Sequence, residues 1–240
     1  MTDYIVVPLF WGPTFPSVPE NTSTTPFSPQ QFVDALNAVV GSGYFSHLDQ
    51  YGIGKTLISQ PISVDDPWPT PPDGTYVTKF RVDDVSQFLK HRLTTQPEVF
   101  AEVVWGGGEI PIKPIYLIIL PNGSVFWDGA VVNTSDNGYH YTSLGSDPII
   151  WAWIYGSANL NGAILYATHE IVEALGNDGT APKELCDECA KIEPNGVPLL
   201  NGLTVATYFD SRKNKCVAPG SLDTSIGAFR DHMLRPRQLP

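Results

Sequence analysis

Three ionisable residues interrupt an otherwise apolar helical segment, and this feature restricts the fold of the chain more than any other. Between Ala163 and Leu175 most residues are Ala, Ile, Leu, Val or Tyr, yet His169, Glu170 and Glu173 lie among them. A helix that is apolar on most sides packs against other elements on most sides. Ionised groups buried there without partners are costly, so the fold must supply partners or a cation for them.

The spacing of these residues is that of a metal-binding helix. His169 and Glu173 are four residues apart and share one helix face, so both can reach one cation. Glu170 projects about 100° around the helix axis from His169, which keeps it off the metal but close to an attacking water. The pattern is the His-Glu-x-x-His helix of metalloproteases with Glu173 in place of the second histidine. The alternative is an ordinary amphipathic helix with solvated glutamates and a satisfied histidine.

Apolar runs and helical stripes alternate loosely along the chain and predict an α/β fold with a tendency towards α+β and a mixed sheet. The expected strands are residues 4–10, 56–64, 115–120 and 149–155. The expected helices are residues 29–41, 44–51, 85–93, 160–175 and 226–234, with loops or breaks at 65–75 and 105–108. We expect one domain over residues 1–240, in which a loop-rich tail, residues 176–240, wraps back over the metal helix.

The charge of the chain restricts its partners. The formal net charge is −11, which repels phosphate backbones and anionic lipid, so we expect neither nucleic acid nor a membrane surface as a partner. No apolar run approaches the length of a membrane span. We expect a small-molecule or peptide substrate, and the oligomeric state stays open. The start, Met1-Thr2-Asp3, lacks the positive charge of a signal peptide, which allows a cytoplasmic location or a mature chain whose leader was removed.

Several segments in a fixed order resemble the sequence blocks of one family. They are residues 8–12, 44–52, 120–123, 138–140, 169–174, 184–189 and 216–217, which together span most of residues 5–218. On these blocks the chain resembles the phosphate-induced protein 1 or Exordium-like group and its bacterial and fungal relatives. The helix of that group resembles a zincin active-site helix, so the resemblance implies a single zincin-like, metalloprotease-like domain. One departure is Asn177, which stands where relatives carry an aspartate after the helix.

The resemblance also bears on the third metal ligand. A catalytic zinc ion usually takes three protein ligands and one water, and we expect one zinc ion per chain. Asp187 is the first choice for the third ligand because it lies in a matched block, although it could equally be a loop-capping carboxylate. Glu184, Asp178 and His140 are the alternatives. His140 could instead donate a hydrogen bond to the transition state, and we expect it in a catalytic role beside Glu170.

The chain has three cysteines, too few for a closed four-cysteine zinc site. The resemblance implies a disulfide between Cys189 and Cys216, with Cys186 left free. A disulfide slightly favours a secreted mature form, because disulfides persist in oxidising compartments.

Three functions fit this pattern. The first is a zinc-dependent hydrolase of an amide, peptide or ester bond, in which Glu170 takes the proton of the attacking water. The second is a non-catalytic, extracellular Exordium-like protein with a structural metal site. The third is a specialised biosynthetic metalloenzyme on the same scaffold. Glu170 separates the first from the second, since a structural site has no use for a free carboxylate beside the metal.

Overall fold

A computed structural model gives the fold for part of the chain. It describes residues 1–11, 27–64, 78–80, 82–97, 112–120, 124–127, 132–133, 138–142, 149–155, 159–176 and 185–221. Several expectations from the sequence lie outside these residues: the loop at 65–75, the break at 105–108, the helix at 226–234, and the alternative ligands Asp178 and Glu184.

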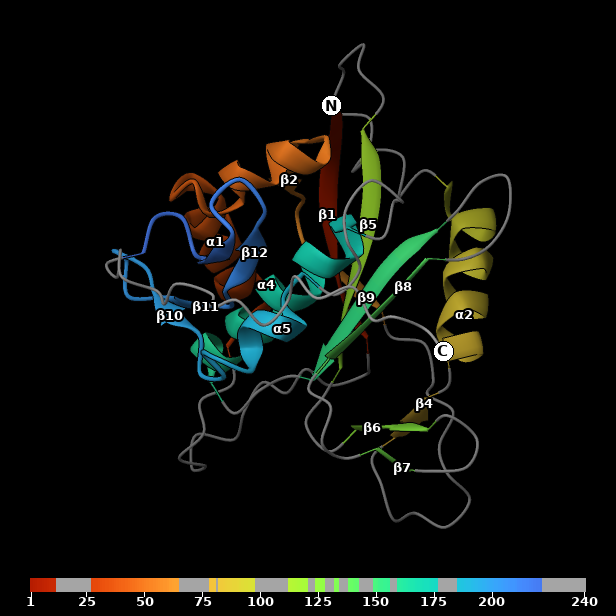
Figure 1. The fold of residues 1–240 in the computed structure, drawn as a ribbon. Helices are drawn as coiled ribbons and strands as arrows, with labels where there is room; N and C mark the ends of the chain where they lie inside the picture. The colour runs from red at the N-terminus through yellow and green to blue at the C-terminus, as the bar shows by residue number, and fades with distance from the viewer. Residues whose placement is uncertain are drawn as a thin grey trace, which may run out of the picture.

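A mixed sheet of six strands forms the centre of the described structure (Figure 1). Its strands are β1 (Thr2–Trp11), β2 (Ile53–Ile58), β3 (Ile62–Val64), β5 (Lys113–Leu120), β8 (Gly138–Thr142) and β9 (Ile150–Tyr155). The order is β2-β1-β5-β9-β8, and β3 also pairs with β1. All neighbours are parallel except β8, which runs antiparallel to β9. The expected α/β class with a mixed sheet is therefore confirmed.

The central strands are continuous apolar runs because both faces of the sheet are covered. Successive side chains of a strand point to opposite faces. In β5, Ile115, Leu117 and Ile119 join the core under α4 (Leu160–Gly176), whereas Tyr116 and Ile118 join a second core. That second core includes buried side chains of α2 (Val82–Thr95) on the opposite face. Figure 1 shows α4 and α2 on opposite sides of the strands.

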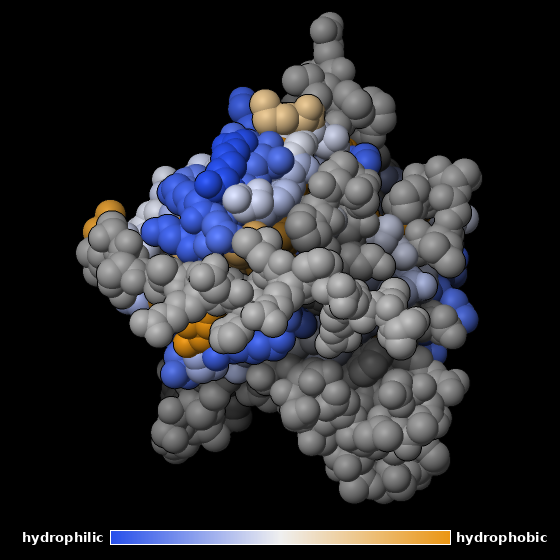
Figure 2. All heavy atoms as spheres, in the orientation of Figure 1, coloured by the Kyte–Doolittle hydropathy of each residue, from blue (hydrophilic) through white to orange (hydrophobic). Residues whose placement is uncertain are grey.

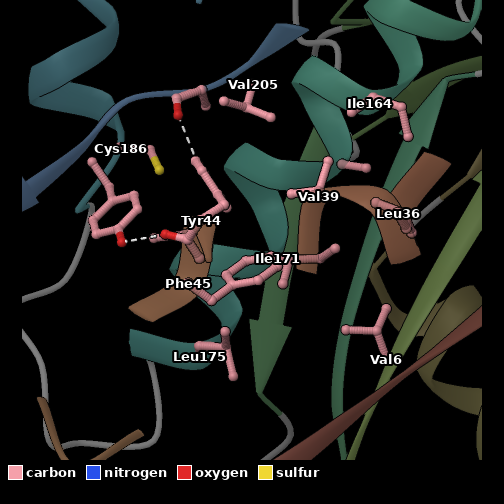
Figure 3. Close-up of a cluster of buried hydrophobic side chains, with 14 of the residues drawn as sticks. Val6, Leu36, Val39, Tyr44, Phe45, Ile164, Ile171, Leu175, Cys186 and Val205 are labelled. Carbon is pink, nitrogen blue, oxygen red and sulfur yellow. Dashed lines mark hydrogen bonds between the residues drawn. The ribbon is translucent and has the colours of Figure 1, made fainter. Parts of the chain in front are cut away.

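The core under α4 also receives α1 (Pro29–Gly41) and the 3-10 helix η1 (Tyr44–Tyr51). Side chains of these helices share one buried cluster with those of α4, and Figure 3 shows Leu36, Val39 and Ile171 among its members. α1 begins as the sequence predicts. Ser28 caps it in a capping box with Gln31, and a proline occupies its first turn.

The strand expected at residues 56–64 is wrong as a single element. The structure has two strands there, β2 and β3, which pair with successive parts of β1. Between them, the ladder is interrupted around Pro61. Proline has no backbone N–H to donate to the neighbouring strand, which explains the interruption. The helix expected at 85–93 is longer on both sides, since α2 spans Val82–Thr95.

The described part of the tail, residues 185–221, packs against α4. Ala206 donates its backbone N–H to Thr168 Oγ1 at 3.0 Å, which joins the tail directly to the helix. The described part, residues 185–221, contains the short helix α5 (Asp187–Ala190) and two antiparallel ribbons. The ribbons are β10 (Val197–Pro198) with β11 (Thr204–Val205), and β12 (Tyr208–Asp210) with β13 (Lys215–Val217).

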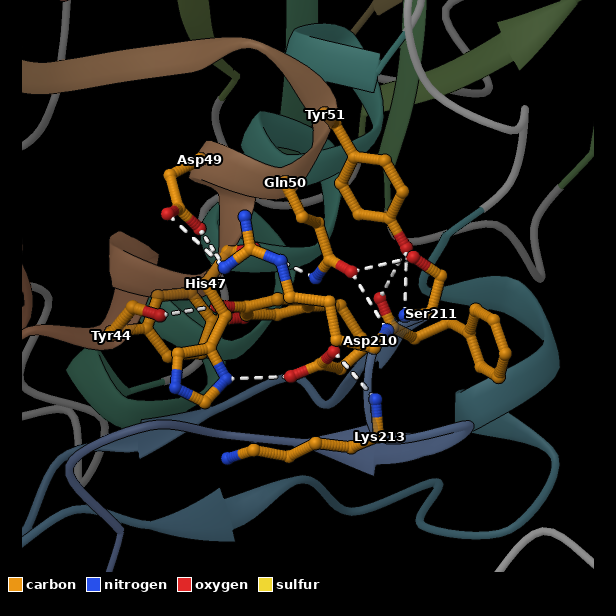
Figure 4. Close-up of polar contacts among 11 residues, drawn as sticks. Tyr44, His47, Asp49, Gln50, Tyr51, Asp210, Ser211 and Lys213 are labelled. Atoms are coloured by element: carbon orange, nitrogen blue, oxygen red, sulfur yellow. Dashed lines mark hydrogen bonds and ion pairs between the residues drawn. The ribbon is translucent and has the colours of Figure 1, made fainter.

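Polar contacts fix the tail to η1 (Figure 4). The Tyr44 hydroxyl donates to the Ala206 carbonyl at 2.7 Å, and the Tyr208 hydroxyl donates to the Tyr44 carbonyl at 2.6 Å. His47 Nδ1 lies 2.8 Å from Asp210 Oδ2. On this face, the described surface over η1 and the β12–β13 turn is mostly hydrophilic (Figure 2). The tail is therefore held at a defined place beside α4.

A small separate sheet contains β4 (Thr78–Phe80), β6 (Ser124–Trp127) and β7 (Val132–Asn133), which the sequence did not predict. Among the described helices, none is both long and apolar enough to cross a membrane.

Candidate metal centre

Five titratable side chains meet where α4, the edge strand β8 and α5 come together. α4 supplies His169, Glu170 and Glu173, β8 supplies His140, and Asp187 is the first residue of α5. α4 packs against both β8 and β9, which brings His140 to the helix across 30 positions of sequence. All five residues that the sequence predicts for the site are therefore close together.

The first group of candidate ligands is His169, Glu173 and Asp187. His169 Nε2 lies 3.3 Å from Glu173 Oε2 and 3.2 Å from Asp187 Oδ1. The Asp187 side chain is 56% exposed and that of His169 is 20% exposed. This group thus has an open side, formed by Asp187.

The second group is His140, Glu170 and Glu173, and it shares Glu173 with the first. His140 Nδ1 lies 3.2 Å from Glu170 Oε2 and 3.2 Å from Glu173 Oε2. The side chains of this group are each less than a tenth exposed: 9%, 8% and 2% in the order His140, Glu170 and Glu173. The second group is therefore closed, whereas the first is open.

The two oxygens of Glu173 have different partners. Oε1 accepts hydrogen bonds from the backbone N–H groups of Cys186 and Asp187, each at 3.1 Å. Oε2 faces both histidines. The tail backbone therefore sets the orientation of this carboxylate and leaves one oxygen for a cation.

The donor atoms of the first group could hold a divalent cation. Around a four-coordinate zinc ion, with bonds of about 2.0–2.1 Å, neighbouring ligand atoms lie about 3.3–3.4 Å apart. The two spacings at His169, 3.3 Å and 3.2 Å, are close to that value. Imidazole nitrogen and carboxylate oxygen are both ordinary zinc ligands. Within the described part of the chain, neither of these two groups of candidate ligands contains both histidines.

Comparison with protein-family models, with curated proteins and with solved structures found no match. The resemblance to the Exordium-like group remains a prediction from sequence blocks. The functional argument therefore depends on the geometry of the site.

The sequence did not reveal two parts of this site. The backbone donors of Cys186 and Asp187 carry no side-chain signal, so their contact with Glu173 follows only from the fold. Gly138 faces Glu170 so closely that a Cβ built there would lie 2.5 Å from Glu170 Oε1. Its position two residues before His140 was a usable signal, because alternate residues of a strand share a face.

The expected disulfide is confirmed. Cys189 and Cys216 are bonded to each other, and the buried Cys186 is outside this disulfide. Cys189 is in α5, two residues after Asp187, and Cys216 is in β13. The bridge therefore ties the segment that carries Asp187 to the second ribbon of the tail.

Opposite charges dominate the protonation of the site. Burial lowers the pKa of His140 and of His169, but hydrogen bonds and charges from the carboxylates outweigh burial and raise each pKa to about 10. Burial raises the pKa of Glu173, but the two histidines outweigh it and lower this pKa to about 2. Burial raises the pKa of Glu170, and here the histidines do not overcome it. In the metal-free site, two imidazolium groups thus supply the positive charge that a cation would supply.

These pKa shifts predict the pH dependence of stability without metal. A histidine with a raised pKa stabilises the fold fully below its unfolded pKa of about 6.5, and this stability is lost as pH rises through the folded value. The lowered pKa of Glu173 gives stability that is lost only in acid, as pH falls from about 4.5 through the folded value. The free energy of unfolding in urea, with chelator present, should be larger at about pH 6 than at about pH 9. The difference should shrink when His140 and His169 are both replaced by asparagine, and a metal-free protein more stable at the higher pH would contradict the prediction.

Proposed function

We propose that this chain is a metal-dependent hydrolase with a zincin-like site, in which His169, Glu173 and Asp187 hold one divalent cation. The observation that carries the proposal is the placement of His169 Nε2, 3.3 Å from Glu173 Oε2 and 3.2 Å from Asp187 Oδ1. Beside them lies Glu170, a buried carboxylate that does not belong to this ligand group. A ligand set with an adjacent, separate carboxylate is what metal-assisted hydrolysis needs.

The open first group suits a catalytic ion better than the closed second group. Catalytic zinc sites keep one coordination position for water or substrate, whereas structural sites are closed. Asp187 is more than half exposed, so substrate can approach from its side. The side chains of His140, Glu170 and Glu173 are each less than a tenth exposed, so an ion held by these three would be less accessible to substrate.

Zinc is our first choice of cation because it accepts nitrogen and oxygen ligands and takes three protein ligands in catalytic sites. When bound, such an ion lowers the pKa of a coordinated water towards about 7 and polarises a carbonyl group. The substrate class is an amide, a peptide or an ester, since each presents a carbonyl carbon for attack by water.

Glu170 is the general base in this proposal. Its burial raises its pKa, which moves the carboxylate towards the range in which a base works best near neutral pH. Glu170 accepts the proton of the attacking water and later passes it to the leaving group. His140 Nδ1, 3.2 Å from Glu170 Oε2, fixes the orientation of the carboxylate. Since Nδ1 faces the carboxylates, a hydrogen bond from His140 to the transition state would come from Nε2.

A structural cation site in a non-catalytic, Exordium-like protein is the second candidate function. The disulfide beside Asp187 favours it, because such bridges are common in extracellular proteins. A biosynthetic metalloenzyme on the same scaffold would share the chemistry proposed above and differ only in its substrate.

Metal analysis of the purified protein tests the proposed ligands. Protein purified without added metal should contain close to one zinc, or another first-row metal, per chain. His169→Ala and Asp187→Asn should each lower the metal content strongly, because the first removes a ligand atom of the first group and the second removes the negative charge of another ligand. His140→Asn should retain the metal, because its ring lies in the second group.

Two results would overturn this assignment. Native protein without metal, in which added zinc gives no rise in Tm, would remove the cation altogether. Loss of metal in His140→Asn but not in Asp187→Asn would move the cation to the second group, where Glu170 would become a ligand rather than a base.

A further inference from the structure

Alternate residues of the edge strand β8 point towards α4. Tyr141 packs on Trp151, with ring centroids 5.5 Å apart, in the core on the opposite face of the sheet. His140 points the other way and reaches Glu170. Gly138 is two residues before His140 and therefore lies on the same face, towards α4. It pairs with Ile154, which belongs to the core under α4.

A side chain at position 138 would collide with Glu170. A Cβ built on Gly138 would lie 2.5 Å from Oε1, 2.6 Å from Cγ and 2.9 Å from Cδ of Glu170. Carbon atoms in proteins essentially never approach other heavy atoms so closely without a bond, and the three nearest atoms all belong to this one side chain. The Glu170 side chain therefore occupies the space that any other residue at position 138 would fill.

The backbone does not require glycine at this position. Gly138 is in regular strand pairing and is not among the glycines with positive φ. A glycine inside a strand weakens it, and it often marks a place where another group approaches closely. Here the approaching group is a carboxylate that is nearly fully buried.

We infer that Gly138 is a positioning residue for Glu170, because its missing side chain makes the space that holds the carboxylate beside His140. The inference rests on the proposed role of Glu170 as general base. Because Gly138 has no side chain, the Glu170 side chain can lie close against β8. His140 Nδ1 then fixes the orientation of Glu170 Oε2. A methyl group at position 138 would displace the carboxylate from His140 while leaving His169 and Asp187 untouched.

A double-mutant cycle on thermal stability tests the contact itself, without any assay of activity. Gly138→Ala should lower the Tm of the metal-free protein by several degrees, because the methyl group collides with Glu170. In a Glu170→Ala background the space is empty, so the same change should leave the Tm nearly unaltered. Gly41→Ala is the matched control, since a Cβ at Gly41 meets nothing within 4 Å, and its effect should be equal in both backgrounds.

Metal content and kinetics then test the positioning role. Gly138→Ala should keep its metal and its KM for a chromogenic ester or a labelled casein, but lose roughly 10²-fold in kcat, the usual cost of a misplacement of about 1 Å. Glu170→Asp shortens the side chain and makes room for the methyl group. The Gly138→Ala, Glu170→Asp variant should therefore be more active than the product of the two single effects predicts.

The outcomes separate this inference from the proposed function. An equal loss of Tm in both backgrounds, or additive kinetic effects, would overturn the role of Gly138 even in an active hydrolase. A wild-type protein that hydrolyses neither probe would overturn the base role on which the inference rests, while the stability cycle would still decide whether Gly138 and Glu170 collide.

Discussion

Replacing Glu170 with glutamine should lower the rate of hydrolysis by roughly 10²–10⁴-fold, the usual value of general acid–base catalysis. Glutamine keeps the size and polarity of the side chain, and it can still accept a hydrogen bond from His140. It cannot take a proton from water at neutral pH. Because Glu170 is outside the first ligand group, the variant should keep its metal and its fold. Steady-state kinetics, metal analysis and thermal melting on the same preparation measure all three properties.

Glu173→Gln is the matched control, because it makes the same chemical change one turn along the helix. Glu173 Oε2 is 3.3 Å from His169 Nε2, so this variant loses a charged ligand and should lose the metal together with the activity. If Glu170→Gln keeps full activity while Glu173→Gln loses the metal, the site is a structural cation site and the hydrolase proposal is wrong.

The sequence predicted the parts of the site that depend on helical periodicity. The helix expected at residues 160–175 is α4, Leu160–Gly176, and the four-residue spacing places His169 and Glu173 on one face. The apolar pattern also identified β1, β5 and β9, because strands buried on both faces consist almost wholly of apolar residues. These features follow from local rules, because the spacing of residues along a helix or a strand determines the side on which each side chain lies.

The parts that the sequence left open depend on long-range packing. Whether His140 reaches Glu170 or lies in solvent depends on the antiparallel pairing of β8 with β9, which no local pattern specifies. The choice of Asp187 among four candidate ligands depends on where the tail lies against α4. The position of the tail is determined by long-range contacts. One example is the hydrogen bond from the Tyr44 hydroxyl to the Ala206 carbonyl, which joins residues 162 positions apart.

The tail does more than supply Asp187, because it also holds Glu173. Two consecutive backbone N–H groups, at Cys186 and Asp187, bind Glu173 Oε1. The segment is fixed at its start by a hydrogen bond from Phe209 N to the Leu185 carbonyl at 3.0 Å. At its other end, the Cys189–Cys216 disulfide fixes it. One ligand of the proposed metal and the orientation of another therefore depend on the same short segment.

Removing this disulfide should consequently weaken metal binding. The comparison should use Cys186→Ser with Cys216→Ser against Cys186→Ser alone, because the sulfur of Cys186 could otherwise form a new bridge to Cys189. Without the bridge, α5 is held mainly from its Leu185 side, so Asp187 and the two backbone donors lose their fixed place. Loss of such supporting contacts typically costs 10–100-fold in metal affinity, so we expect the Kd for zinc to rise by roughly that factor. The free energy of unfolding should also fall by about 2–5 kcal/mol.

Competition with a chelating dye measures the Kd, and urea unfolding in the presence of chelator measures stability separately from metal binding. The two measurements separate the contribution of the disulfide to metal binding from its contribution to the stability of the fold. If stability falls and the Kd stays the same, the packing of β12 alone is sufficient to place Asp187. The disulfide then stabilises the fold and has no influence on the metal site. If both change, reduction of one disulfide by a dithiol releases the metal, because Glu173 loses its two backbone donors at the moment that Asp187 moves away from His169.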